Sequence, residues 1–363
     1  MIAEYLSRYT SATLAAGGTQ TLISSDGEPK TARVYNRLYV EGTFDFSLLF
    51  SPVTDSTFGD GSRTPRNFPA EPWTLFCASV SVCQTGNPEE DTGIRTQLQF
   101  GGSPEKKVAE GEIFASDPVS LEVKRGEYLS LEIHYAGSRL PCHEESIVPV
   151  FQKGEGGWIP NSRVPIPSMT GCSRKVSTRV CFLGDSITQG IGTPVDSYRH
   201  YAAVTAERIG FEGIAYWDIG LGWARAEDAA SGGVWIARAK INDVVSVCLG
   251  VNDLLQGRSD QEVIASLLRI VSDLKEAGCR VLVQTLPPFD YEGPLKTSWE
   301  TVNRFILTDP ALNADAVFDC VPLLGQPGQP EMARYGGHPD PEGCRIWAEA
   351  LAPVLKTLFD RTK

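Results

Sequence analysis

The chain has 363 residues, of which 42% are hydrophobic, and it carries a formal net charge of -12. This length supplies enough apolar material for one large domain or two ordinary ones, and we expect two. The negative charge repels polyanions, and no basic cluster reverses it locally. The composition therefore argues against a nucleic-acid partner.

The nine cysteines are an odd number, and none of them shows CxxC spacing. This distribution favours buried free thiols over a disulfide framework or a zinc site. The N-terminal stretch MIAEYLSRYT lacks the apolar core of a signal peptide, and no uncharged run approaches about 18 residues. We expect a soluble, cytoplasmic protein without a membrane partner, or a secreted one if a leader has been removed.

Residues 1–151 are predicted to form an all-β domain. Apolar and polar side chains alternate in GTFDFSLLF (residues 42–50), and again on both sides of an Arg125-Gly126 turn in SLEVKRGEYLSLEI (residues 120–133). A period of two is typical of strands with one buried face. Glycine- and proline-rich turns separate the runs, so we expect antiparallel sheets packed as a sandwich or jelly roll.

A linker is predicted over residues 152–176. This segment contains three prolines and four glycines and shows no clear period. Such a composition is typical of loops, so we place the domain boundary here.

The hydrophobic period changes in residues 177–363. Short apolar runs alternate with helical patterns, of which DQEVIASLLRIVSDLKEAG (residues 260–278) is the clearest, with Gly278 as its stop. The apolar runs are 179–183, 213–219, 243–249, 279–285 and 315–319. This alternation predicts a three-layer α/β/α domain with about five parallel strands. Its ligand site should lie beyond the carboxyl ends of the strands.

Chemically useful residues follow three of these runs. Asp185 and Ser186 come after the first, where either could cap the next helix or Ser186 could act as a nucleophile. Gly220 and Gly222 come after the second, where the backbone must turn sharply. Asn252 comes after the third, and its side-chain amide could donate to developing negative charge or close a local turn.

Elimination singles out one of the four histidines. His200 lies in a helical stretch, and His134 and His143 lie in the β half, so we assign these three structural roles. His338 follows the fifth apolar run and precedes the last helix, at the same edge of the sheet as Ser186. Imidazole can accept a serine proton near neutral pH and return it to a leaving alcohol, so His338 is the candidate general base.

Four segments in order resemble the four sequence blocks of the SGNH (GDSL-type) hydrolase family. They are GDSIT at 184–188, the glycine loop after the second run, GVND at 250–253 and HP at 338–339. The resemblance spans about residues 178 to 360 and implies a flavodoxin-like fold, ester hydrolysis, and no metal or organic cofactor. It also implies Ser186 as the nucleophile and His338 as the general base and then acid. The implied oxyanion hole consists of the Ser186 amide, Gly222 and Asn252.

The last block departs from the family pattern. The family usually has Asp-x-x-His, and here Tyr335 stands at the position of the aspartate. Of the nearest acids, Glu331 and Asp340, the second is expected to cap the last helix ahead of its first-turn proline. We therefore expect a Ser-His dyad in which a backbone carbonyl orients the imidazole.

The second block departs as well. Asp218 and Trp223 stand where the family usually has asparagine and a further glycine, so the oxyanion amide belongs to Gly222 or to Trp223 itself. The Trp223 ring would project beside the site, and its flat apolar face suits a sugar ring or an acyl chain. The remaining candidate supporting residues are Asp185, Asp253 and Tyr335.

The leading hypothesis is a serine esterase that removes acetyl or another short acyl group from a sugar or oligosaccharide. Some two-domain carbohydrate esterases of the superfamily, which have an N-terminal β-sandwich and lack the aspartate, are similar to this chain. A lipase-like or lysophospholipase-like acylhydrolase is an alternative, although no amphipathic or long apolar segment suits a lipid surface. A carbohydrate-binding protein with a decayed hydrolase domain is a third hypothesis. The sequence leaves the oligomeric state open.

Overall fold

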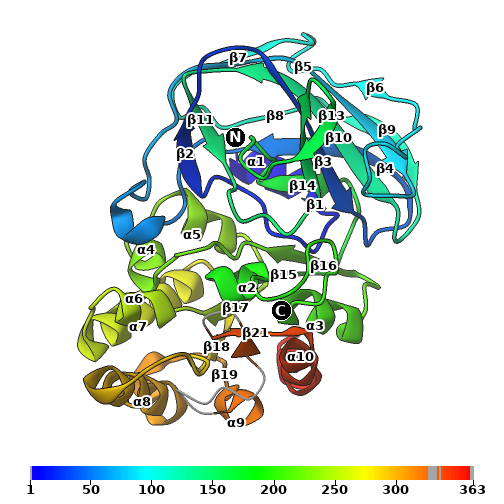
Figure 1. Cartoon of the computed structure of the whole chain (residues 1–363). Coiled ribbons are helices and arrows are strands. Elements are labelled where there is room, and N and C mark those ends of the chain that lie inside the picture. The colour runs from blue at the N-terminus through cyan, green and yellow to red at the C-terminus, as the bar shows by residue number, and fades with distance from the viewer. Residues whose placement is uncertain (1, 326–332, 335–336, 360–363) are drawn as a thin grey trace. The chain divides into compact units, whose positions relative to one another are not determined.

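The chain divides into two compact units, Met1–Lys175 and Val176–Lys363. Their structure is taken from a computed structural model that describes residues 2–325, 333–334 and 337–359. Figure 1 colours the first unit blue to green and the second green to red.

The N-terminal unit is built from antiparallel sheets, as the alternating pattern predicts. The five-stranded sheet consists of β1 (Thr10–Ser11), β14 (Met169–Cys172), β4 (Gly42–Phe50), β8 (Phe114–Ala115) and β9 (Val119–Val123). The seven-stranded sheet consists of β13 (Gly157–Pro160), β12 (Val150–Gly154), β3 (Lys30–Arg37), β10 (Tyr128–Ala136), β5 (Trp73–Cys83), β6 (Thr96–Gln97) and β7 (Lys106–Val108). A small sheet pairs β2 (Thr21–Ser24) with β11 (Arg139–Cys142), and the short helices are α1 (Ile2–Arg8) and η1 (Gly59–Gly61).

The two larger sheets share an apolar core. Leu129, Leu131 and Ile133 on β10 are fully buried. Trp73 of the seven-stranded sheet packs against Phe114 of the five-stranded sheet, with ring centroids 6.1 Å apart. Gly126 has a φ of 92°, and the turn it forms leads from β9 in one sheet to β10 in the other. The predicted turn therefore passes between the sheets and does not close a hairpin.

The prediction of a linker over residues 152–176 is wrong. This segment contains most of β12 and all of β13 and β14. The β12 strand pairs with β3, and β14 pairs with β4, so both belong to the N-terminal sheets. The period is hidden because these strands have only four or five residues and all four positions of β14 are buried. Alternation needs a longer strand with one exposed face to be visible.

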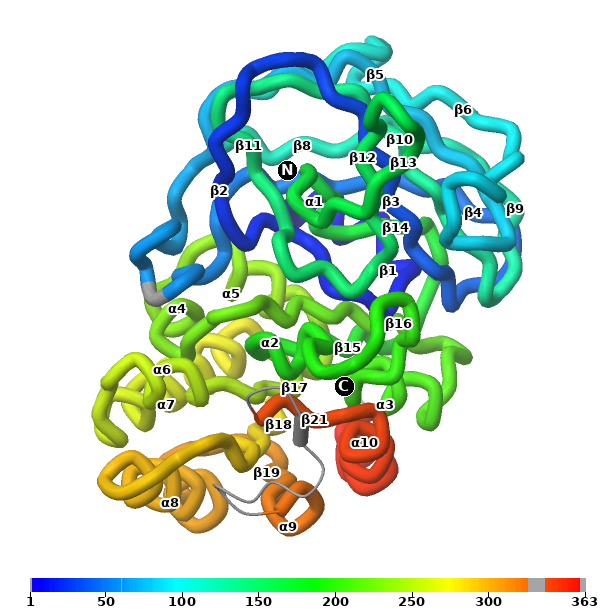
Figure 2. Tube along the Cα trace, in the orientation of Figure 1, coloured from blue at the N-terminus to red at the C-terminus, as the bar shows by residue number. Residues whose placement is uncertain are grey.

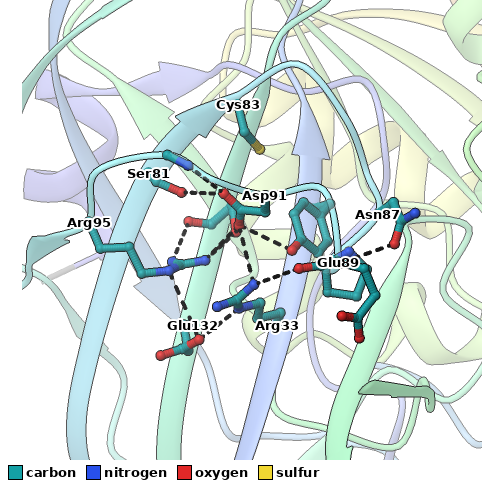
Figure 3. Close-up of polar contacts among 12 residues, drawn as sticks. Arg33, Ser81, Cys83, Asn87, Glu89, Asp91, Arg95 and Glu132 are labelled. Carbon is teal, nitrogen blue, oxygen red and sulfur yellow. Dashed lines mark hydrogen bonds and ion pairs between the residues drawn. The ribbon is translucent and has the colours of Figure 1, made fainter. Parts of the chain in front are cut away.

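A buried ionic network fastens the segment between β5 and β6 to the seven-stranded sheet (Figure 3). The Asp91 carboxylate, fully buried, accepts hydrogen bonds from Ser130 at 2.8 Å, Arg95 at 2.9 Å and Tyr35 at 3.1 Å. Burial opposes the charge, but the Ser130 bond and the Arg95 guanidinium hold the pKa of Asp91 below its ordinary value. A buried carboxylate with this many donors is a structural anchor.

The C-terminal unit has a parallel sheet with strand order β16-β15-β17-β18-β19. The strands are β15 (Thr178–Gly184), β16 (Ile214–Asp218), β17 (Val244–Cys248), β18 (Arg280–Gln284) and β19 (Ala316–Phe318). Counted along the chain, the order is 2-1-3-4-5, which is the flavodoxin-like arrangement. Four strands lie within one of the predicted apolar runs, and β15 extends one residue beyond its run at each end. The predicted three-layer domain is confirmed.

Helices cover both faces of this sheet (Figure 1). The longer ones are α3 (Tyr201–Ile209), α7 (Asp260–Glu276), α8 (Gly293–Thr308) and α10 (Pro341–Lys356). The shorter ones are α2 (Ser186–Gln189), α4 (Ala226–Ala230), α5 (Val234–Ala239), α6 (Val251–Leu255), α9 (Val321–Leu324) and η2 (Pro310–Leu312), and a small sheet pairs β20 (Ala333–Arg334) with β21 (His338–Pro339). The α3 and α10 helices pack together, as do α7 and α8.

The α7 helix shows how local signals define an element. Ser259 caps its N-terminus and forms a capping box with Glu262, which satisfies two backbone N–H groups. Gly278 has a φ of 88° and stands just beyond its end, as the sequence predicts. Among the described residues, no helix is long and apolar enough to cross a membrane.

Candidate active site

Ser186 and His338 meet at the carboxyl end of the parallel sheet. Ser186 is the first residue of α2 and is separated from the end of β15 by Asp185, and His338 lies on β21, just before α10. The Ser186 Oγ atom lies 2.8 Å from His338 Nε2. Figure 2 shows the chain trace of α2 beside β21, which contacts it. A hydroxyl within hydrogen-bond reach of an imidazole nitrogen is the arrangement that activates a serine nucleophile.

The helix cap at this point is Asp185 and not Ser186. The Asp185 carboxylate accepts a hydrogen bond of 3.0 Å from the Ile187 backbone N–H. One of the two candidate caps therefore performs the capping, and the Ser186 hydroxyl engages the imidazole.

The GVND segment holds the glycine loop that follows β16. The Asn252 side chain donates to the Ala224 carbonyl at 3.0 Å. The Asp253 carboxylate accepts from the backbone N–H groups of Ala226 at 2.7 Å and Glu227 at 3.1 Å, at the start of α4. A side-chain amide has two N–H groups, so the bond to Ala224 fixes the amide and uses one of them. Asp253 thus holds the end of the loop at the start of α4.

Trp223 occupies an unusual position in the same loop. Its φ is 64°, a left-handed conformation that is strained for a non-glycine residue. Trp223 is 43% exposed, whereas Gly222 beside it is buried. The Leu221 amide donates to the Gly184 carbonyl at 3.0 Å, which ties this loop to the end of β15 just before Ser186.

Residues 182–346 match the GDSL-like lipase/acylhydrolase family. The C-terminal unit carries a domain of this family. It is therefore a carboxylic ester hydrolase domain, as the four sequence blocks predict. Comparison with curated proteins gave no match.

Solved structures similar to the chain include three hydrolase-related proteins. A lipolytic G-D-S-L family member from Veillonella parvula covers 49% of this chain and 98% of its own, with 20% identity and a TM-score of 0.42. A carbohydrate esterase family 3 protein from Talaromyces cellulolyticus covers 51% of this chain and 100% of its own, with 21% identity and a TM-score of 0.41. A family two carbohydrate esterase from Clostridium thermocellum, solved with cellohexaose, covers 93% of this chain and 94% of its own, with 14% identity and a TM-score of 0.42.

The acylhydrolase domain also contains a buried His–Asp pair that the sequence did not reveal. His200 Nε2 lies 3.2 Å from Asp218 Oδ2, and both side chains are buried. Asp218 also accepts from the Gly220 amide at 2.7 Å, so it holds the start of the glycine loop. Burial raises the pKa of Asp218, while the contact with His200 opposes that rise. The one sign of this pair in the sequence was Asp218, an aspartate at a strand end where the family usually has asparagine.

The acid closest in sequence to His338 is Asp340, and its carboxylate is engaged in a helix cap. Asp340 caps α10, where its Oδ1 atom accepts from the backbone N–H groups of Glu342 at 3.0 Å and Gly343 at 2.9 Å. The predicted cap is confirmed. Tyr335 and Glu331 lie outside the described residues. Within the described part of the chain, no group of three or more His, Cys, Asp or Glu residues is arranged to hold a metal ion.

Asp185 and Asp253 are two buried carboxylates of the acylhydrolase domain. Burial is the main cause that raises the pKa of Asp185 to about 7, and the charge of Asp253 adds to the rise. Burial likewise raises the pKa of Asp253 to about 6. The Ile187 amide opposes the shift at Asp185, and the Ala226 and Glu227 amides oppose it at Asp253.

Asp185→Asn is expected to become more stabilising as the pH rises. The pKa of Asp185 is higher in the folded chain than in the unfolded chain, so the folded state loses stability between about pH 4 and pH 7. Asparagine keeps the cap and removes the charge. At about 1.4 kcal/mol per pH unit, the free energy of unfolding of the variant relative to wild type should rise by about 2–3 kcal/mol from pH 5 to pH 8. Urea unfolding at both pH values tests this, and a constant difference would contradict it.

Proposed function

We propose that the chain is a serine esterase that hydrolyses short acyl esters, acetyl esters above all, of a carbohydrate. The observation that carries this proposal is the 2.8 Å contact between Ser186 Oγ and His338 Nε2 at the carboxyl end of the sheet. The reaction runs through an acyl-enzyme on Ser186 and uses a Ser-His dyad. The Asp340 carboxylate, which accepts two backbone bonds in the α10 cap, supports a dyad without that acid.

The proposed chemistry begins with attack of Ser186 Oγ on the ester carbonyl carbon while His338 Nε2 takes the hydroxyl proton. The electron pair of the carbonyl π bond moves to the oxygen, which becomes an oxyanion. The intermediate collapses, the bond to the alcohol breaks, and the alcohol leaves with the proton from His338. Water then attacks the acyl-enzyme with His338 as the base, which releases the carboxylic acid and restores Ser186.

The oxyanion requires fixed donors, since each such donor contributes about 3–4 kcal/mol to transition-state stabilisation. The proposed donors are the Ser186 amide, the amide of Gly222 or Trp223, and the second N–H of Asn252. The Asn252 bond to the Ala224 carbonyl supports this role because it holds the side-chain amide against the loop that carries the other donor. A preorganised donor loses no energy to reorientation during the reaction.

The proposed alcohol component is a sugar, and Trp223 is its proposed platform. This residue is 43% exposed and is held by a strained backbone in the loop after β16. Strain of this kind persists where the surrounding structure imposes it, and it is concentrated at functional sites. An indole face contacts the apolar face of a sugar ring, while its edge donates a hydrogen bond.

A panel of esters tests the reaction and the acyl preference together. Purified protein should hydrolyse p-nitrophenyl acetate faster than butyrate and octanoate. Rates that increase with acyl length would favour a lipase-like acylhydrolase instead. No hydrolysis of any ester, acetylated sugars included, would favour a decayed hydrolase that binds carbohydrate.

Trp223→Ala tests the sugar platform. KM of the variant for an acetylated oligosaccharide should be higher by roughly 10-fold or more. A nucleobase, which is similar in size to a sugar ring, gains about 1–3 kcal/mol by stacking on an aromatic side chain. The variant should leave KM for p-nitrophenyl acetate unchanged, whereas Trp223→Phe should retain most of the affinity. Equal KM values for the oligosaccharide in all three proteins would remove Trp223 from the substrate site.

A further inference from the structure

The imidazole of His338 lies against an aromatic ring that the proposed mechanism does not use. Phe289, in the segment that follows β18, contacts His338 with ring centroids 5.5 Å apart and an interplanar angle of 77°. In an edge-to-face pair of this kind, the positive edge of one ring meets the negative face of the other. The contact therefore resists rotation of the imidazole about its χ2 angle.

The backbone around His338 is shaped to admit this contact. Gly337 has a φ of 87°, and a Cβ at this position would lie 2.6–3.0 Å from three atoms of the Phe289 ring. On another side, a Cβ at Gly192 would lie 2.9 Å from the His338 Cβ. Real Cβ atoms essentially never lie closer than 3.0 Å to such a neighbour, so both glycines let neighbouring segments close on His338.

The segment that carries Phe289 is itself held by α8. Asn303 accepts from the Leu286 amide at 2.8 Å and donates to the Leu286 carbonyl at 3.0 Å. The Trp299 indole also donates to that carbonyl, at 2.9 Å. These bonds satisfy both backbone groups of Leu286, so the segment has a fixed position on the domain.

Aromatic rings continue the support from α8 to the imidazole. Trp299 packs against Tyr291 with centroids 5.8 Å apart, and Tyr291 packs against Phe289 at 6.2 Å. Tyr291 and Trp299 are buried, and Phe289 is half-buried at the end of the row next to His338. Groups locked by packing in this way can hold a reacting side chain in its productive geometry.

We propose that Phe289 is a positioning residue for His338. It restrains the imidazole plane so that Nε2 stays directed at Ser186 Oγ, a task that a triad carboxylate would otherwise share. This inference rests on the proposed function, because it assumes that His338 is the general base.

The test compares Phe289→Leu with Phe289→Tyr, using p-nitrophenyl acetate as substrate. Because loss of near-attack geometry can cost about 100-fold in rate, Phe289→Leu should lower kcat by roughly 10- to 100-fold and leave KM within about 2-fold. Phe289→Tyr keeps the ring and should retain kcat within about 3-fold of wild type. A purely structural role would lower the fraction of folded protein and would not separate kcat from KM or require a ring.

Phe211→Leu is the matched control. Phe211 precedes β16, at the opposite end of the strands from the site, and packs edge-to-face on Tyr216 with centroids 5.9 Å apart. This control removes a similar aromatic contact and should leave kcat unchanged. If Phe289→Leu and Phe211→Leu have the same kcat per folded molecule, Phe289 does not position His338.

Two further measurements keep the outcomes distinct. Ser186→Ala, assayed in parallel, separates a failure of the proposed function from a failure of the inference about Phe289. A full rate in Ser186→Ala overturns the proposed function. An inactive Ser186→Ala together with a wild-type rate in Phe289→Leu overturns only the role of Phe289. Proton NMR of the wild-type imidazoles does not depend on whether a variant folds. The His338 ring protons should be shifted by the Phe289 ring current relative to free histidine, and unshifted resonances would contradict the contact.

Discussion

Ser186→Ala is expected to abolish ester hydrolysis, with kcat lowered by roughly a thousand- to million-fold, as in other serine hydrolases. Alanine removes the hydroxyl that lies 2.8 Å from His338 Nε2. The stability of the protein should change little, because Asp185 supplies the cap of α2. Steady-state kinetics and thermal unfolding of the same samples measure both effects.

Asp185→Ala is the matched control for this first prediction. At about pH 5, where the Asp185 carboxyl is uncharged in the folded chain, loss of the capping side chain costs about 1 kcal/mol, so this variant should show there the stability change that Ser186→Ala lacks. Activity retained by a pure sample of Ser186→Ala would end the assignment of Ser186 as the nucleophile. If the free energy of unfolding of Ser186→Ala falls by about 1 kcal/mol while kcat is unchanged, Ser186 acts as a helix cap.

His338→Ala should be nearly as damaging to kcat as the serine change, whereas Asp340→Ala should leave most of kcat in the folded protein. The reason is that the imidazole moves the proton in every step, while the Asp340 carboxylate is engaged with two backbone N–H groups of α10. Loss of that cap should cost about 1 kcal/mol, up to about 2, in the free energy of unfolding. Kinetics corrected for the folded fraction separate the two effects.

Asp340→Asn keeps the capping oxygen and isolates the charge. This variant should be stable and active, and Glu331→Ala should have a smaller effect still. If either acid change lowers kcat several thousand-fold in folded protein, a charged third member exists and the dyad is wrong. The pH profile is a second check: a dyad oriented by a backbone carbonyl adds no negative charge beside the imidazolium, so the activity limb that reports His338 should lie near or below about 6.5, the ordinary pKa of histidine.

The parallel sheet could be predicted because its strands are local features. Most are short runs of buried apolar residues, such as the five buried positions of β17, and are bounded by polar or glycine signals, whereas the edge strand β19 is partly exposed. The α7 helix carries its cap at Ser259 and its stop at Gly278, so its bounds follow from neighbouring residues. The strands within 152–176 could not be predicted, because β12 and β14 are specified by pairing with β3 and β4, which are distant in the sequence.

The site could be predicted as a set of strand-end residues but not as a set of bonds. Ser186 and His338 were brought together by topology, since the carboxyl ends of parallel strands share one edge. By contrast, the bond from Asn252 to the Ala224 carbonyl and the pair formed by His200 and Asp218 depend on side-chain packing. No periodicity in a single sequence encodes which buried polar groups satisfy one another.

Active-site labelling tests the central claim, that Ser186 forms the acyl-enzyme, most directly. A fluorophosphonate probe should phosphonylate Ser186 Oγ with loss of fluoride, and peptide mass spectrometry should find one adduct per chain on that residue. Hydrolysis of p-nitrophenyl acetate should decline in proportion to labelling, and Ser186→Ala should take up no probe. Inactivation that tracks labelling of a different residue, or full hydrolysis by protein labelled at Ser186, would contradict the account.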